Sequence, residues 1–305
     1  MSHGAARRLD LKAGPKILCS PLLESVSGLV NGFSTRTGGH SQVYGEDQLN
    51  LSFTASDRRE AVERNRADFL IALAAEESRL LTLRQIHSDI VHVVTSPKQL
   101  PAKGKSLNGD GLITNLPGVL ISVQTADCVP VLIADTKQRV VAAVHAGWRG
   151  TAKRIAEKAV GTMRARFASR PRDLRAAIGP AIQQCCYAIG NDVIEEFESQ
   201  FAYAKKLFCE VYDQDPVKKK YPLLFMTARA PGHSHIGPQM HLDLIEANRR
   251  QLLDAGMSKK NIWAAQECTS CRTDMLFSHR AEGGYTGRMM AVIGYRELTP
   301  QERLL

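Results

Sequence analysis

The segment that most constrains this chain covers residues 125–150 and reads TADCVPVLIADTKQRVVAAVHAGWRG. Two apolar runs flank the polar turn sequence at 135–139, a pattern that predicts two paired strands. Cys128 stands at the start of the first run, and His145 stands at the end of the second. A thiol and an imidazole at the ends of neighbouring strands can converge on one point. Arg149 follows in a tight Gly-Trp-Arg-Gly turn, so the segment has the composition of an active site.

Length and composition point to an ordinary globular enzyme. A chain of 305 residues can bury a full core as one large domain or two small ones. Its 44% hydrophobic and 23% charged residues are typical of globular proteins. No apolar run approaches the roughly 20 residues that span a bilayer, and no signal-peptide-length run follows the basic N-terminus. We therefore expect a cytoplasmic enzyme without a membrane partner.

The net charge of +9 fits a solvated surface and a phosphate-bearing or phosphate-using substrate. Nucleic-acid binding would need a basic stripe interleaved with aromatic residues, and aromatics are only 6% of the chain. No such stripe is found. We expect small-molecule partners, no nucleic acid, and a monomer or weak oligomer.

The order of apolar patterns predicts a single α+β domain. Helical periodicity is found at 58–75, 151–166, 191–197 and 242–254. Further strand patterns occur at 81–94, 110–114, 119–124, 176–178, 262–265 and 289–293, besides a short strand running into a glycine-rich loop at 32–39. This mixture lacks strict βαβ alternation, which favours a layered sandwich of mixed β-sheets flanked by helices.

Two boundaries divide the chain. Residues 1–29 are expected to form an N-terminal extension and first strand, and residues 30–298 a single catalytic domain. Residues 204–240 have little periodicity and include Lys218-Lys219-Lys220. A long irregular segment inside a compact domain is usually a surface insertion or a lid.

His87, near the beginning of the 81–94 pattern, completes the strongest constellation with Cys128 and His145. A two-histidine, one-cysteine set leaves a fourth position open, as catalytic zinc sites do. Zinc there would polarise a water or a substrate atom and lower the pKa of that water. Spacing alone favours the other interpretation, in which a strand-end histidine is simply a satisfied polar residue.

Several motifs change this balance, because together they resemble the laccase-domain family, once labelled polyphenol oxidases and now regarded as purine nucleoside phosphorylases. The matching segments are Gly32-Phe33-Ser34-Thr35-Arg36-Thr37-Gly38-Gly39, Gln85-Ile86-His87, Thr125-Ala126-Asp127-Cys128-Val129-Pro130, Val144-His145-Ala146-Gly147-Trp148-Arg149-Gly150, Ile178-Gly179-Pro180-Ala181-Ile182, Cys268-Thr269, Phe277-Ser278-His279-Arg280 and Thr286-Gly287-Arg288. They run in order over about residues 30–295. The chain departs at His279, where family members more often carry an aromatic residue.

The resemblance implies zinc held by His87, Cys128 and His145, with copper as the less favoured metal. It also implies phosphorolysis of adenosine, inosine, guanosine and 5′-methylthioadenosine, with an adenosine deaminase side activity.

Arg149, in a tight turn at a helix start, is the first candidate for binding phosphate. The alternative is that it stacks on Trp148. Arg36, in the glycine-rich loop, is the second phosphate candidate. Asn50 is a weaker candidate for contact with ribose or base. Asp127 adjoins Cys128, but alternation along a strand would turn its carboxylate to the opposite face, so no general acid or base is identified.

Two rival functions use the same residues. Cys128 and His145 could form the nucleophile and base of a thiol amidase or hydrolase. A copper-dependent phenol oxidase would also use two histidines and a cysteine, but laccases need further histidine-rich sites. His233-Ser234-His235 is the one closely spaced histidine pair in the sequence. A non-enzymatic binding module is disfavoured by a metal set beside an anion-binding turn.

The other cysteines are predicted to have structural roles. Seven cysteines in a chain without a secretory signal argue for reduced, mostly buried thiols. Cys185 and Cys186 are adjacent and cannot easily pair with each other. Cys268 and Cys271 form a CxxC, but a lone CxxC lacks the second pair that a structural zinc site needs. Redox sensing and accidental metal affinity remain the alternatives for this pair.

Overall fold

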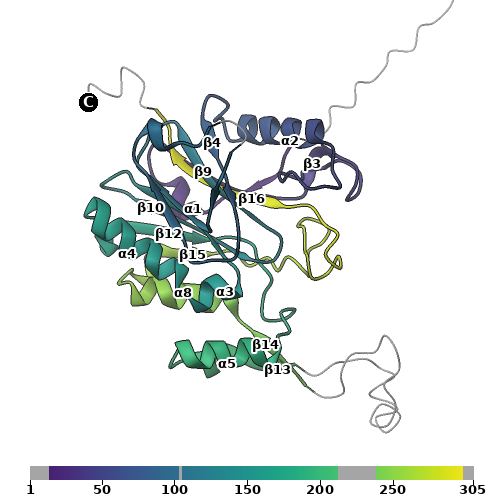
Figure 1. The fold of residues 1–305 in the computed structure, drawn as a ribbon, viewed down its shortest axis with the longest axis vertical. Helices are drawn as coiled ribbons and strands as arrows, with labels where there is room; N and C mark the ends of the chain where they lie inside the picture. The colour runs from purple at the N-terminus through teal and green to yellow at the C-terminus, as the bar shows by residue number, and fades with distance from the viewer. Residues whose placement is uncertain (1–13, 103–104, 212–237, 298–305) are drawn as a thin grey trace, which may run out of the picture.

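Two β-sheets packed face to face form the centre of the molecule (Figure 1), in a computed structural model that describes residues 14–102, 105–211 and 238–297. The five-stranded sheet has the order β1 (Ile17–Leu18), β2 (Leu29–Ser34), β16 (Met289–Tyr295), β9 (Val119–Thr125), β4 (Arg79–Leu81). The six-stranded sheet has the order β15 (Ile262–Ala264), β12 (Leu174–Ile178), β10 (Val129–Asp135), β11 (Val141–Ala146), β8 (Gly111–Thr114), β6 (Val91–Val94).

Most neighbouring strands in these sheets are antiparallel, but β4–β9, β12–β15 and β6–β8 are parallel, so both sheets are mixed. Smaller pairs are formed by β5 (Leu83–Arg84) with β7 (Leu107–Asn108), and by β13 (Phe208–Val211) with β14 (Gln239–Leu242). Strand β3 spans Thr37–Ser41. The α-helices within the described residues are α1 (Pro21–Glu24), α2 (Arg59–Ala72), α3 (Trp148–Ala152), α4 (Ile155–Phe167), α5 (Asn191–Gln200) and α8 (Leu244–Asp254). Short 3₁₀ turns lie at Pro97–Gln99, Pro171–Asp173, Ala204–Lys206 and Lys259–Asn261.

Alternation along the central strands separates the core into layers. In β9, Ile121 packs between the two sheets, whereas its neighbour Leu120 packs in the cluster with Phe69 of α2. In β10, Leu132 belongs to the inter-sheet core, whereas Val131 belongs to the cluster beneath α4 and α8. Because successive side chains of a strand point to opposite faces, each central strand is buried on both sides.

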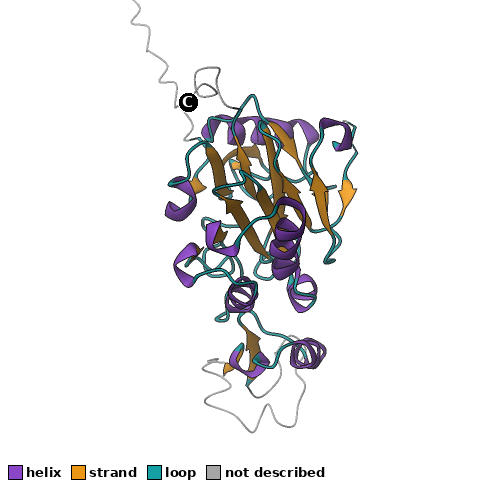
Figure 2. Cartoon of the chain, turned by 90° about the vertical axis from the view of Figure 1, so that its left-hand side faces the viewer, coloured by secondary structure: helices purple, strands orange, loops and turns teal. Residues whose placement is uncertain are grey.

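Helices therefore cover the outer face of each sheet, as Figures 1 and 2 show. Helix α2 covers the five-stranded sheet, and α4 and α8 cover the six-stranded sheet. Their order is helix, sheet, sheet, helix. This confirms the predicted α+β sandwich of mixed sheets flanked by helices.

Local differences from the sequence patterns are concentrated near His87. The 81–94 pattern is not one strand: β4, β5 and β6 occupy its two ends, and a loop carries His87 between them. The helix expected at 151–166 is divided into α3 and α4 by Arg154, which has a left-handed φ of 60°. The glycine-rich loop expected after residue 34 contains strand β3.

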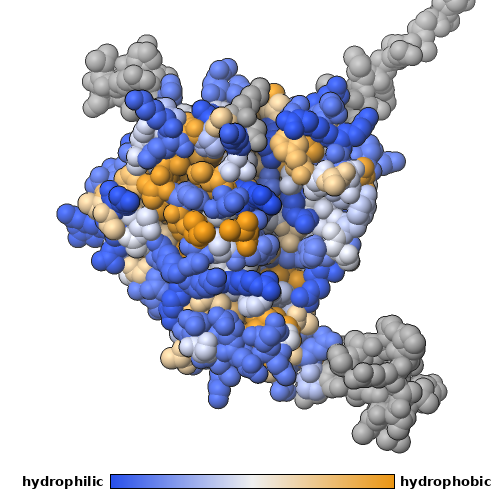
Figure 3. Space-filling view, in the orientation of Figure 1, coloured by the Kyte–Doolittle hydropathy of each residue, from blue (hydrophilic) through white to orange (hydrophobic). Residues whose placement is uncertain are grey.

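The irregular segment at 204–240 is described only at its ends, which form a 3₁₀ turn, β13 and the start of β14. The segment 218–220 and His233-Ser234-His235 lie outside the described residues. Among the helices that are described, none is long and apolar enough to cross a bilayer. The face in Figure 3 is largely hydrophilic around an apolar area.

Candidate metal centre and its cavity

Antiparallel pairing of β10 with β11 brings Cys128 and His145 to the same sheet edge. Pro130 lies opposite His145, and Val129 lies opposite Ala146. Cys128 immediately precedes β10, so its thiol starts one strand where the imidazole of His145 ends the next. The convergence predicted from the two apolar runs is therefore present.

His87 reaches this edge from the loop between β5 and β6. Its φ of 56° places the backbone in the left-handed region, where non-glycine residues are uncommon. The carboxylate of Asp110 holds the loop by accepting hydrogen bonds from the backbone amides of Ile86, His87 and Ser88, at 3.3, 3.0 and 2.6 Å. The Ser88 hydroxyl donates a further hydrogen bond to Asp110.

The three donor residues form one cluster. Their candidate ligand atoms all lie within 4.8 Å of one another, and the Cys128 Sγ to His87 Nε2 distance is 3.9 Å. Gly147 makes room for them, because a Cβ there would lie 3.0 Å from Cys128 Sγ and 3.1 Å from His87 Cδ2. Two imidazoles and a thiolate fit a transition-metal ion and leave a position for substrate or water. The residues present therefore fit the implied metal.

Asp110 also orients His145, a role that the sequence analysis missed. Its Oδ1 lies 2.9 Å from His145 Nδ1, and both side chains are buried. A histidine that donates its Nδ1 proton to a carboxylate presents Nε2 as a metal ligand. In the sequence, Asp110 is marked only by its place directly before an apolar strand pattern, and aspartates are common at such turns.

Charge interactions shift the pKa values of this cluster strongly. Burial raises the pKa of Cys128, but the charge of His145 and its hydrogen bond outweigh burial and lower it to about 6. Burial lowers the pKa of His145, but the charge of Cys128 and the hydrogen bond to Asp110 raise it to about 9. Burial likewise raises the pKa of Asp110, but hydrogen bonds from His145 and Ser88 lower it to about 2. Both shifts favour the thiolate form of Cys128 and the imidazolium form of His145.

The cluster opens into a cavity of about 430 Å³, a size typical of small-molecule sites. The residues that line it are Ser52, Arg84, Gln85, His87, Gln124, Thr125, Ala126, Cys128, His145, His279 and Arg288. Arg84 and Arg288 add positive charge, and neither forms an ion pair within the described chain. No carboxylate is among these lining residues. His279 is the one lining imidazole outside the metal donors.

Both arginines expected to bind phosphate lie outside this lining. The Arg149 side chain is exposed, and its guanidinium stacks 4.3 Å above the Trp148 ring, which is the alternative considered from sequence. Arg36 is buried and donates to Gln48, the Thr273 and Tyr44 carbonyls and Glu282. These contacts give Arg36 a structural role in joining the loops around β3 to residues 273–282.

Asn50 and Asp127 also have structural partners. Asn50 is fully buried, donates to Asp57 and the Ser52 carbonyl, and accepts from the Ser52 and Arg288 amides. Asp127 is absent from the cavity lining, but strand alternation is not the reason: it lies in the bend between β9 and β10, with a φ of 93°. Its carboxylate accepts from Thr269 at 2.6 Å, Ser278 at 2.7 Å and the Arg280 amide at 2.6 Å.

Known proteins are similar to this chain in both sequence and fold. The sequence profile described as "Multi-copper polyphenol oxidoreductase laccase" matches residues 30–296. Purine nucleoside phosphorylase YlmD from Geobacillus stearothermophilus is 35% identical over 275 residues, covering 89% of this chain and 92% of that protein. Adenosine deaminase RL5, from an unknown prokaryotic organism, is 34% identical over 281 residues, covering 90% and 96%. The crystal structure of hypothetical protein YfiH from Bacillus licheniformis superposes with a TM-score of 0.77 at 31% identity, covering 95% of this chain and 98% of that one.

Proposed function

We propose, from the premise that this chain belongs to the multi-copper polyphenol oxidoreductase laccase family, that it is a zinc-dependent purine nucleoside phosphorylase. Relatives named purine nucleoside phosphorylase and adenosine deaminase support an enzyme that processes nucleosides. The observation that carries the proposal is the cavity itself. It joins the His87–Cys128–His145 donor set to two arginines that have no acidic partner in the described chain.

Phosphorolysis requires a dianion to attack the anomeric carbon of ribose while the bond to the purine breaks. Arg84 and Arg288 supply the positive charge for that dianion, in place of Arg149 and Arg36. The Arg288 Nη1 is already fixed by the carbonyls of Thr286 and Gly287, at 2.9 Å each, so this guanidinium is held against the cavity wall. Phosphate is the co-substrate that such a pair would select over water.

The leaving purine needs a proton, and His279 is the lining imidazole available to donate it. Asp110 holds His145 in the tautomer that presents Nε2, so the donor set keeps its geometry through the reaction. A zinc ion, when bound to His87, Cys128 and His145, supplies a Lewis acid with an open coordination position. Adenosine, inosine, guanosine and 5′-methylthioadenosine are the proposed substrates.

Adenosine deamination is the proposed side activity, and the relative named adenosine deaminase supports it. Zinc deaminases use a carboxylate as general acid and base. None is present among the lining residues of this cavity, which favours phosphorolysis as the main reaction.

A chromatographic assay tests this proposal. Inosine incubated with phosphate should yield hypoxanthine, and omission of phosphate should abolish the release. Arg84→Gln and Arg288→Gln should each raise the KM for phosphate more than the KM for inosine, whereas the matched control Arg149→Gln should leave both near the wild-type values. Equal effects of Arg84→Gln on both KM values would remove its assigned role.

The thiolate–imidazolium pair favours one second candidate, a Cys128–His145 thiol hydrolase, because a pKa of about 6 activates a cysteine nucleophile. Metal analysis of protein purified without added metal separates the two. A metal ion on Cys128 supports the phosphorylase; a metal-free protein whose Cys128 is rapidly alkylated supports the hydrolase. A copper oxidase is disfavoured, because the described residues contain no further histidine-rich cluster.

A further inference from the structure

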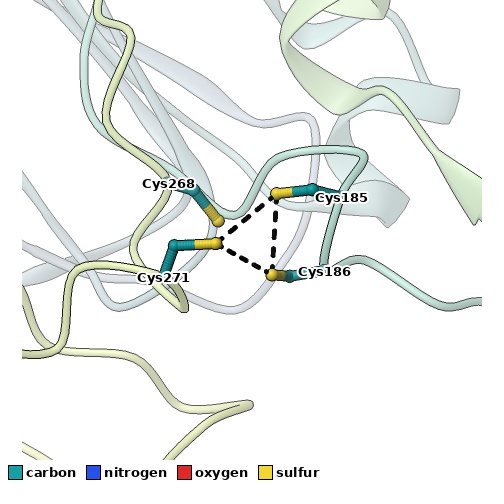
Figure 4. Close-up of side chains that lie close together, drawn as sticks. All are labelled: Cys185, Cys186, Cys268 and Cys271. Carbon is teal, nitrogen blue, oxygen red and sulfur yellow. Dashed lines mark hydrogen bonds between the residues drawn. The ribbon is translucent and has the colours of Figure 1, made fainter. Parts of the chain in front are cut away.

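Four cysteines from two distant segments converge in a second cluster (Figure 4). Cys185 and Cys186 lie in a turn beyond β12, and Cys268 and Cys271 lie in a turn beyond β15. Parallel pairing of β12 with β15 sends both segments to the same end of the six-stranded sheet. All four sulfur atoms lie within 4.8 Å of one another. The lone CxxC of the sequence therefore has the second cysteine pair that it lacked.

The sulfur separations match a metal site and not a disulfide. Cys185 Sγ lies 3.6 Å from Cys186 Sγ and 3.7 Å from Cys271 Sγ, and the Cys186–Cys271 separation is 3.3 Å. A tetrahedral ion with Zn–S bonds of about 2.3 Å places its sulfurs about 3.8 Å apart. A disulfide needs about 2.05 Å. All seven cysteines lie in the described part of the chain, and none is in a disulfide.

The backbone holds the two turns together without any ion. Ala181 and Cys268 form a parallel bridge, and the Thr269 amide donates to the Ala181 carbonyl at 3.1 Å. Within this frame the Gln183 amide donates to Cys268 Sγ at 3.4 Å, a contact that favours a thiolate sulfur. Gln183 Nε2 bonds to the Gln266 carbonyl across the same gap. The four thiols are thus preorganised.

Two of these thiols are also unusually exposed for free cysteines. Cys185 and Cys271 are exposed, although free cysteines are among the most buried residue types. Four sulfur donors, with no histidine or carboxylate in the group, select a soft ion and occupy all positions of a tetrahedron. This contrasts with the three donors and open position at His87, Cys128 and His145.

We propose that Cys185, Cys186, Cys268 and Cys271 bind a second, structural Zn²⁺ ion as a closed tetrathiolate site. This inference does not depend on the proposed phosphorylase activity, because it rests on a separate cluster.

The site would brace the catalytic cavity through Asp127, the residue before Cys128. The Ile182 amide, next to the first cysteine turn, donates to the Asp127 carbonyl at 2.9 Å. Thr269, inside the second turn, donates its hydroxyl to Asp127 Oδ1. Asp127 has a φ of 93°, a strained conformation that needs such support. An ion that joins the two turns would hold both contacts in place, which makes the four cysteines positioning residues.

Metal analysis of the whole protein, expressed with zinc and purified without chelator, tests this proposal. Wild type should carry about two zinc ions per chain, one at each centre, and the Cys185→Ser/Cys271→Ser variant should lose one of them. The matched control Cys209→Ser, on β13 outside both clusters, should keep both. A wild-type stoichiometry of one that Cys185→Ser/Cys271→Ser leaves unchanged would overturn the proposal.

A second measurement does not depend on how well that variant folds. Zinc X-ray absorption of a Cys128→Ala/His145→Ala variant, whose first centre is removed, should show sulfur ligands alone at about 2.3 Å. Nitrogen or oxygen ligands in that spectrum, or a Cys186–Cys271 disulfide found by mass spectrometry after rapid alkylation, would contradict a tetrathiolate site. Chelation of this zinc should also lower the midpoint of thermal unfolding.

Discussion

Asp110 connects the two histidines of the candidate metal centre, although it is not itself a donor. It accepts from His145 Nδ1 and from the backbone of the loop that carries His87. Because Asp110 is fully buried, losing one of these hydrogen bonds would leave a polar group without a water to replace its partner, at a cost in free energy. The position of His87 and the tautomer of His145 therefore depend on one carboxylate.

Asp110→Asn tests this role at the scale of one residue. We expect metal affinity and phosphorolysis to fall about 10- to 100-fold, because an amide cannot accept from all these donors with the strength of a carboxylate. Metal titration and the inosine assay measure the two effects. Asp68→Asn is the control, since Asp68 bonds His40 at 2.7 Å outside the cavity lining. Equal losses in both variants would contradict the assignment.

Gly147 provides a steric test of the same centre. An alanine Cβ would lie 3.0 Å from Cys128 Sγ, so Gly147→Ala should displace the thiolate and lower activity on the order of 100-fold. Gly161→Ala in α4 is the control, because a Cβ there would meet open space. This variant should raise the free energy of unfolding by about 0.5–1 kcal/mol. Normal metal content and activity in Gly147→Ala would show that the donor set tolerates the methyl group.

At the scale of elements, the central strands were predictable and the loops were not. The runs around Cys128 and His145 have the apolar pattern and polar turn of a hairpin, and the structure pairs them as expected. The prediction of one strand over 81–94 was wrong, because the carboxylate of Asp110, distant in sequence, accepts hydrogen bonds from residues 86–88 and holds them in a loop. A side-chain contact over more than twenty residues leaves no periodic signal.

Helix α2 gives a packing test at this scale. Phe69 is fully buried against the five-stranded sheet, whereas Ile71 of the same helix is 60% exposed. Phe69→Ala should lower the free energy of unfolding by about 3–5 kcal/mol. Ile71→Ala should change it by less than about 0.5 kcal/mol. Denaturant unfolding measures both, and similar losses would contradict the packing of α2.

At the scale of the whole molecule, the four-layer sandwich places both donor clusters beside strand ends of the six-stranded sheet. The structure brings together His87, Cys128 and His145, the three residues that the resemblance implied as metal donors. It did not identify the cavity arginines, because Arg84 and Arg288 are far apart in sequence and meet only around the cavity. The cysteine cluster was hidden for the same reason: β12 and β15 pair only in the folded sheet.

In the proposed function, a metal held by His87, Cys128 and His145 drives phosphate-dependent cleavage of purine nucleosides. The most direct test compares hypoxanthine release from inosine by wild type and Cys128→Ala, with Cys209→Ser as the control, at saturating phosphate and with metal content measured on each sample. Release should require phosphate, persist in Cys209→Ser, and disappear in Cys128→Ala together with one zinc ion per chain. Full phosphorolysis by a folded Cys128→Ala protein would contradict the account.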